Sequence, residues 1–160
     1  WHYRETGDSF LEVKKKSNRE RTIKNRLPLT SQTVASGQVN HFLEEQLGLP
    51  VAGMLPALFV SYRRMTLMSP LGTERITLDT GLAFHSADRQ SGIRLPDVAV
   101  FEVKYDRKIP GSPLLDRLGQ LGCRPVQFSK YCIGTSLLFG HECKTNRFKP
   151  LLRRLHGICS

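Results

Sequence analysis

The first apolar segments of the chain alternate with charged residues in the two-residue rhythm of a β-strand. Segment Ser9–Lys16 places Leu11 and Val13 on one face, because successive residues of a strand point to opposite sides. Arg21–Leu29 alternates in the same way. The polar residues 17–20 between the two segments favour a hairpin connection. The pattern therefore predicts two antiparallel strands at the start of the chain.

The middle of the chain predicts further antiparallel strands. Four segments there are rich in β-branched, aromatic and other apolar residues, which suit a pleated surface. Proline and glycine separate the first segment from the second, as expected at a turn. The four segments are Pro56–Met68, Arg75–Asp79, Leu82–His85 and Asp97–Asp106.

Apolar residues at helical spacing predict four helices. These are Gln38–Leu47, a segment carrying Leu114, Leu115, Leu118 and Leu121, Ser129–Phe139 and Asn146–His156. Two polar stretches, 30–37 and 86–96, read as loops. The order of elements predicts an α+β protein with a helical C-terminus.

Five of the predicted strands pair a charged face with a largely apolar face. The charged faces carry Glu12, Lys14 and Lys16; Thr22, Lys24 and Arg26; Tyr62, Arg64 and Thr66; Arg75, Thr77 and Asp79; and Glu102 and Lys104. A half-solvated sheet explains any one such face. Here lysine and arginine dominate, and their mutual repulsion needs compensation. An antiparallel barrel or tunnel with the basic faces inward meets that need when several phosphates occupy the lumen.

Composition points to the same class of ligand. The chain has 160 residues, enough for one domain, which we take to span residues 1–160. Its 24 Lys and Arg against 14 Asp and Glu give a net charge of +10, which favours an anionic partner. No apolar run approaches the roughly 20 residues of a membrane span. The spacing of the four cysteines favours reduced thiols in a cytoplasmic protein over a disulfide framework.

Two near-copies, FLEVKKK at 10–16 and VFEVKYD at 100–106, place a glutamate two residues before a lysine on a strand. A carboxylate among interior lysines can hold a divalent cation that bridges phosphate oxygens. We therefore expect Glu102 and Glu12 to bind a metal ion. Lys104 and Lys14 should bind phosphate.

Five segments, in order along the chain, resemble the polyphosphate polymerase domain of the vacuolar transporter chaperone proteins. That family lies within the triphosphate tunnel metalloenzyme superfamily. The resemblance covers about residues 3–138. The segments are FLEVKKKSNRERTIKNR, VSYRRMTL, ERITLDTGLAF, VFEVKYD and FSKYCIG.

The resemblance implies a tunnel of antiparallel strands that binds ATP or another nucleoside triphosphate, together with polyphosphate and Mn²⁺ or Mg²⁺. It implies metal binding by Glu102, with Glu12 as a second acid. The implied phosphate ligands are Lys14, Lys24, Arg26, Arg64, Arg75, Lys104 and Lys130, the last at a helix start that favours an anion. Relatives carry an R-x-R motif just before a tyrosine that matches Tyr3. We therefore expect either that the chain is N-terminally truncated or that its tunnel wall is incomplete.

The expected activity is transfer of the ATP γ-phosphate onto a growing polyphosphate chain, which relies on positioning and electrostatic stabilisation. A triphosphatase that delivers the phosphate to water is one alternative, and it uses the same residues. A polyphosphate-binding module without catalysis is a second, and it needs the lysines but not the acid. A third, nucleic-acid binding, predicts salt-sensitive binding. The sequence contains no RNP-type or helix-turn-helix motif, so we expect no specific nucleic-acid partner.

Overall fold

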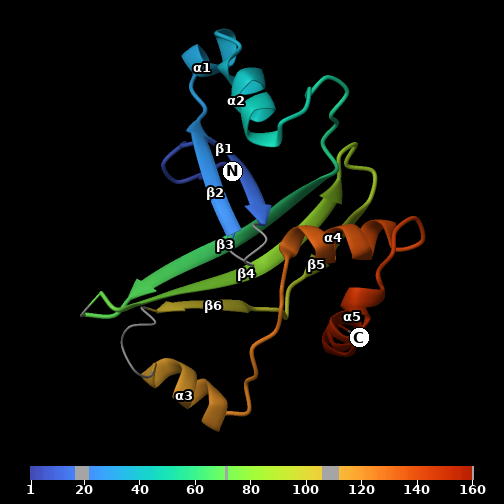
Figure 1. Cartoon of the computed structure of the whole chain (residues 1–160). Helices are drawn as coiled ribbons and strands as arrows, with labels where there is room; N and C mark the ends of the chain where they lie inside the picture. The colour runs from blue at the N-terminus through green and yellow to red at the C-terminus, as the bar shows by residue number, and fades with distance from the viewer. Residues whose placement is uncertain (17–21, 71, 106–111, 160) are drawn as a thin grey trace. The chain divides into compact units, whose positions relative to one another are not determined.

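The computed structural model describes residues 1–16, 22–70, 72–105 and 112–159 (Figure 1). The chain divides into two compact units, Trp1–Leu55 and Pro56–Ser160. Residues 17–20, where the sequence predicts a hairpin connection, lie outside the described residues. The structure is α+β with antiparallel sheets, as predicted.

The first unit contains the two strands predicted at the start of the chain. Strands β1 (Phe10–Lys16) and β2 (Thr22–Pro28) form an antiparallel pair. Glu12 lies opposite Arg26 in this pair, and Lys14 lies opposite Lys24. Because alternate residues share a face, the register gathers all four charged side chains on one side of the hairpin.

Helix α1 (Ser31–Ala35) occupies a stretch that the sequence predicts to be a loop, so that prediction is wrong. The cause is a reciprocal cap of two threonines. The Thr33 backbone N–H donates to Thr30 Oγ1 at 3.1 Å, and the Thr30 backbone N–H donates to Thr33 Oγ1 at 2.8 Å. These bonds satisfy donors that a helix start leaves free, and they allow one short turn of helix among polar residues.

Helix α2 (Gln38–Leu47) has the bounds that the sequence predicts. Glycines flank it on both sides, Gly37 and Gly48, each with a left-handed φ of 71°. The Gly48 N–H donates to the carbonyl of Glu44 and closes the last turn.

The second unit is built on a four-stranded antiparallel sheet. Its central strand β4 pairs with β3 on one edge, and successive parts of its other edge pair with β6 and β5. The strands are β3 (Leu58–Met68), β4 (Glu74–Ser86), β5 (Gly92–Leu95) and β6 (Val100–Tyr105). Strand β5 lies in a stretch predicted as loop, because its four residues are too few to show a clear alternation. It pairs with the end of β4, which directly precedes it in the chain.

Strand β4 is continuous, whereas the sequence predicts two strands there. The pairs Ser61 with Ala83 and Arg63 with Thr80 show that β4 carries one extra residue opposite β3. This β-bulge includes Gly81, whose φ is +60°. The left-handed backbone is easy for glycine and strained for other residues, so the bulge bends the strand without ending it.

The bulge places polar and apolar residues on the same face of the sheet. Because it shifts the alternation by one position, Thr77 and Asp79 before it share a face with Leu82 and Phe84 after it, and all four are buried. The apolar end of this face forms the core of the unit. The buried core residues are Leu82, Phe84, Leu95, Val98, Ile133 and Leu155.

The helices of the second unit follow the predicted order. Helix α3 (Pro113–Gln120) begins after its N-cap Ser112. Helix α4 (Lys130–Phe139) lies against β3, β4 and β5 (Figure 1). The predicted last helix is divided into a short 3₁₀ turn, Asn146–Phe148, and α5 (Lys149–Cys159).

The strands form no closed barrel within the described ranges, so the predicted tunnel is not confirmed. The two-stranded sheet belongs to the first unit and the four-stranded sheet to the second. None of the helices in the described parts of the chain is both long and apolar enough to cross a membrane.

Substitution of Gly81 by alanine is expected to destabilise the second unit by about 1–2 kcal/mol, the cost of a left-handed backbone for an L-residue. No heavy atom lies within 4 Å of the added Cβ, so strain alone carries the effect. Gly119→Ala is the control. Gly119 lies in α3 with equally open space and no positive φ, and alanine there should be neutral or slightly stabilising. Urea denaturation followed by circular dichroism measures both, and equal stability of the two variants would contradict the role of the bulge.

Candidate phosphate-binding site

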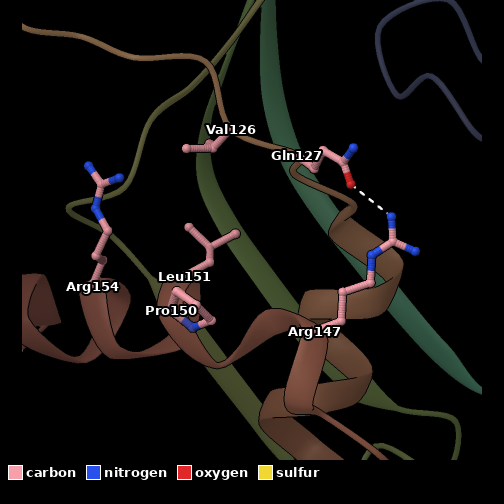
Figure 2. Close-up of a pocket in the computed structure, with 6 residues that line it drawn as sticks. All are labelled: Val126, Gln127, Arg147, Pro150, Leu151 and Arg154. Atoms are coloured by element: carbon pink, nitrogen blue, oxygen red, sulfur yellow. Dashed lines mark hydrogen bonds between the residues drawn. The ribbon is translucent and has the colours of Figure 1, made fainter.

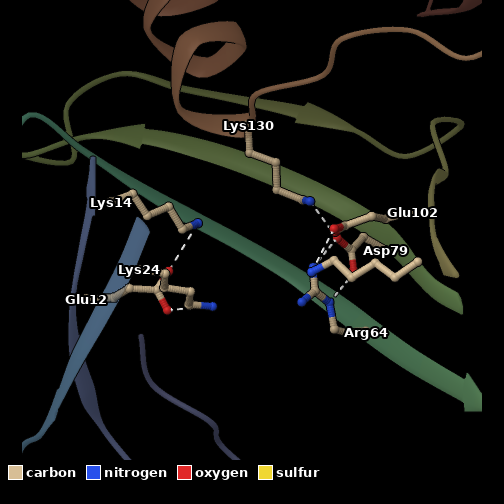
Figure 3. Close-up of polar contacts among 8 residues, drawn as sticks. Glu12, Lys14, Lys24, Arg64, Asp79, Glu102 and Lys130 are labelled. Carbon is tan, nitrogen blue, oxygen red and sulfur yellow. Dashed lines mark hydrogen bonds and ion pairs between the residues drawn. The ribbon is translucent and has the colours of Figure 1, made fainter. Parts of the chain in front are cut away.

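One cluster of cations surrounds the carboxylate of Glu12 in the first unit. Glu12 ion-pairs with Lys14 at 3.1 Å and with Lys24 at 2.8 Å (Figure 3). It also pairs with Arg26 at 2.5 Å, and its side chain is 2% exposed. The cross-strand register explains the cluster, because these residues form two neighbouring pairs on one face of the hairpin. We call these four residues the Glu12 cluster.

The cations determine the protonation of Glu12. Burial by itself raises the pKa of the carboxyl, but hydrogen bonds from Lys24, Arg26 and Lys14 outweigh it and lower the pKa to about 2. Glu12 is therefore an anion at any physiological pH. It offsets part of the repulsion among the three cations on this face.

Aromatic rings support two of these cations. The ammonium of Lys14 lies 5.7 Å from the ring centroid of Trp1, and the guanidinium of Arg26 lies 5.6 Å from that of Phe10. Both distances fit cation–π contacts. Phe10, which lies on the charged face of β1, thus contacts one of the cations.

A second cluster surrounds Asp79 in the second unit. Arg64 donates from Nε to Oδ1 at 2.6 Å and from Nη2 to Oδ2 at 2.7 Å, and the Lys130 ammonium lies 2.5 Å from Oδ2 (Figure 3). Asp79 is 1% exposed. Burial raises the pKa of Asp79, but the bonds from Arg64 and Lys130 outweigh this effect and lower it. We call Asp79, Arg64 and Lys130 the Asp79 cluster.

Three elements supply the Asp79 cluster. Arg64 of β3 lies opposite Asp79 of β4 in the strand register. Lys130 is the first residue of α4, whose N-cap Ser129 accepts a hydrogen bond from the backbone N–H of Cys132. The ring of Tyr62 lies against both cations, with its centroid 5.2 Å from Arg64 and 4.7 Å from Lys130.

Strand β6 continues the same face with Glu102 and Lys104. Their side chains form an ion pair at 3.0 Å and are 50% and 58% exposed. Glu102 lies opposite Thr77 and Lys104 lies opposite Arg75. Burial raises the pKa of Glu102, but the Lys104 bond and the nearby charges outweigh it and lower the pKa.

The structure brings together the predicted site residues of each unit. Unit Trp1–Leu55 holds Glu12, Lys14, Lys24 and Arg26 in one cluster, and unit Pro56–Ser160 holds Arg64, Arg75, Glu102, Lys104 and Lys130 on one sheet face or at its edge. The convergence of both sets on one ligand stays a prediction.

Asp79 is the site residue that the sequence reasoning missed. Its signal was present, because Asp79 follows Arg75 and Thr77 at two-residue spacing on a charged face. The sequence analysis gave a role only to the glutamates of the two near-copies FLEVKKK and VFEVKYD, and none to Asp79. The pairing with Lys130 joins residues 51 positions apart, and no local pattern predicts it.

The two predicted metal ligands differ in their surroundings. Glu12 is buried under three cations, so its contacts do not fit a metal ion. We therefore assign it no role as a metal ligand. Glu102 is half exposed and has a single lysine partner, and its oxygens are the donor type that Mg²⁺ and Mn²⁺ prefer. Within the described ranges, no three His, Cys, Asp or Glu side chains gather as a metal site. A cation at Glu102 would therefore need ligands from water and phosphate.

A pocket of ≈ 230 Å³ lies elsewhere in the second unit (Figure 2). Its lining residues are Val126, Gln127, Arg147, Pro150, Leu151 and Arg154. Arg147 donates to the Gln127 side chain at 2.9 Å. The pocket is smaller than typical small-molecule sites and contains none of the clustered acids, so we do not assign it the main site.

A family model described as the VTC domain matches residues 1–139. The chain belongs to the VTC domain family. This family is associated with polyphosphate metabolism. Searches among curated proteins and among solved structures found no match.

The VTC match includes both clusters and the Glu102–Lys104 pair. Helix α5 and the arginines beside the pocket lie beyond residue 139. The part of the chain that defines the family is thus the part that carries the buried acids and their cations.

Glu12 of the VTC domain should make the hairpin acid-sensitive. Its pKa is about 2 when folded and 4.5 ordinarily, so its stabilisation is complete above pH 4.5 and lost as pH falls toward 2. We expect a loss of about 1–2 kcal/mol, because the cations are half exposed and screened. Glu12→Gln should be less stable than the natural chain at pH 6, and most of this difference should be lost at pH 2.

Urea denaturation followed by the fluorescence of Trp1, the single tryptophan, measures this change. Glu5→Gln, which removes an exposed carboxylate of the same unit, should keep the natural pH dependence. An unchanged acid sensitivity in Glu12→Gln would contradict the assignment.

Proposed function

We propose that this VTC domain transfers the γ-phosphate of ATP onto inorganic polyphosphate with the help of a divalent cation. The observation that carries the proposal is the shared basic face of the second unit. There Arg64, Arg75, Lys104 and Lys130 lie on or beside one sheet, around two ordered carboxylates. Membership of a polyphosphate-associated family supports phosphate as the ligand.

The chemistry of these side chains suits phosphoryl transfer. Such reactions need little covalent chemistry from the protein, and they depend on positioning and on stabilising charge at the phosphoryl oxygens. Arg64 and Lys130 are already held in place by Asp79 before any ligand binds. Pre-oriented donors avoid much of the reorganisation cost at the moment of reaction.

Glu102 is the proposed ligand of Mn²⁺ or Mg²⁺. When bound, the cation would neutralise charge on the phosphate oxygens. The role of Lys104 is to pair with Glu102 and to contact phosphate, as its half-exposed position allows. Within this proposal the Glu12 cluster supplies phosphate contacts from Lys14, Lys24 and Arg26.

The tunnel remains part of the proposal. The strands described are antiparallel, and each unit has one strongly basic face. A tunnel that is lined by lysine and arginine and binds phosphate requires this local pattern. If those faces enclose one phosphate chain, polyphosphate should bind both to the cations of the Glu12 cluster and to the cations of the second unit.

Incubation of the chain with ATP and Mn²⁺ tests the reaction. A polymerase makes long polyphosphate, seen as a ladder on a gel, whereas a triphosphatase releases only inorganic phosphate. Binding of tripolyphosphate without either product would identify a binding module. Each outcome selects one of the three functions that use these residues.

Glu102→Gln should lower turnover about 100-fold and leave tripolyphosphate affinity within about threefold, because the acid acts on the metal and the cations bind the phosphate. Steady-state kinetics and calorimetric titration measure the two quantities. Glu142→Gln is the matched control, since it removes an exposed carboxylate outside the clusters. Full activity of Glu102→Gln would reject a catalytic metal at this position.

A further inference from the structure

We propose that Asp79 is a positioning residue, a buried counter-ion that holds Arg64 and Lys130 in the orientation needed to bind a transferring phosphoryl group. This inference rests on the proposed function. It assigns a role to a residue that is expected neither to contact the phosphate nor to bind the metal.

The geometry separates Asp79 from a metal ligand. Its Oδ1 accepts from Arg64 Nε, and its Oδ2 accepts from Arg64 Nη2 and lies against the Lys130 ammonium. Both carboxylate oxygens therefore have cationic partners. Glu102, by contrast, is half exposed and has one lysine partner.

The pairs leave donors for a ligand. A guanidinium and an ammonium each carry more N–H groups than these contacts with Asp79 use. The Arg64 side chain is 33% exposed and the Lys130 side chain 19%, so both cations still reach solvent. Asp79 thus anchors each cation from its buried side, while the exposed side remains open to an anion.

Asp79 also joins cations that come from two different elements. Arg64 is on β3 and Lys130 begins α4, so two like charges from different elements meet beside Tyr62. Without an anion between them these charges repel. The anchor itself is 1% exposed and lies opposite Arg64 in the pairing of β3 with β4.

A counter-ion and a ligand-binding residue have opposite kinetic signatures. Removal of the Asp79 charge makes the site more positive, so attraction for an anion does not fall. Removal also releases Arg64 and Lys130 from their orientation, and a misplacement of about 1 Å can cost about 100-fold in rate. We therefore expect kcat to fall and KM for ATP to stay the same or decrease.

Asp79→Asn tests this expectation with ATP and Mn²⁺ as substrates. The expected result is a kcat lowered about 100-fold, with KM unchanged or lower. Asp97→Asn is the matched control, because it makes the same charge change at an exposed position of the same unit, and its kinetics should stay within about twofold. An unchanged kcat, or a KM that rises with the loss of kcat, would overturn the inference.

A second variant covers the case in which Asp79→Asn does not fold. Arg64→Lys keeps the charge at that position and loses the bidentate pair. If positioning matters, this variant shows the same fall in kcat; KM is not diagnostic here, because Arg64 is itself a proposed phosphate ligand. Normal turnover by folded Arg64→Lys would overturn the inference.

Chemical labelling separates failure of this inference from failure of the proposed function. When the natural chain binds tripolyphosphate without turnover, phosphoryl transfer is rejected, and acylation of Lys130 measured by mass spectrometry becomes the test. Tripolyphosphate should then protect Lys130 in the natural chain and not in Asp79→Asn, and equal protection overturns the inference. A natural chain that does not bind tripolyphosphate overturns both proposals.

Discussion

The burial of a carboxylate beneath several cations is the interaction on which both basic faces depend. An isolated buried carboxylate is costly, and cations gathered on one sheet face repel each other. Glu12 and Asp79 each have a side chain only 2% exposed, and each is surrounded by lysine and arginine. The two costs offset one another, so the protein can hold a concentrated positive face before a phosphate ligand arrives.

The position of the acid relative to the core gives that face its rigidity. In the second unit Asp79 and Leu82 lie on the same side of β4, because the bulge at Gly81 shifts the alternation between them. The basic end of the sheet is thus continuous with its packed end. A site supported by a packed strand keeps its donors in place better than one built on loops, which suits a reaction governed by positioning.

The opposite face of this sheet shows that apolar character alone does not decide burial. Met65, Leu67 and Phe101 are 57%, 50% and 52% exposed, although they fall on the apolar side that the sequence predicts. Meanwhile Thr77 and Asp79, on the charged side, are buried. Alternation predicted which residues share a face, but the location of the core depends on where α4 packs and where β4 is bulged.

The sequence by itself determined most strands and helices and the division of charged from apolar faces, because these follow from alternation and spacing within a few residues. It also predicted Glu102, Arg64 and Lys130 as site residues through resemblance. Tertiary structure alone decided the pairing of β5, the continuity of β4 and the anchoring of Lys130 by Asp79. The Asp79–Lys130 pair joins residues 51 positions apart, and all three features depend on contacts that exist only after folding.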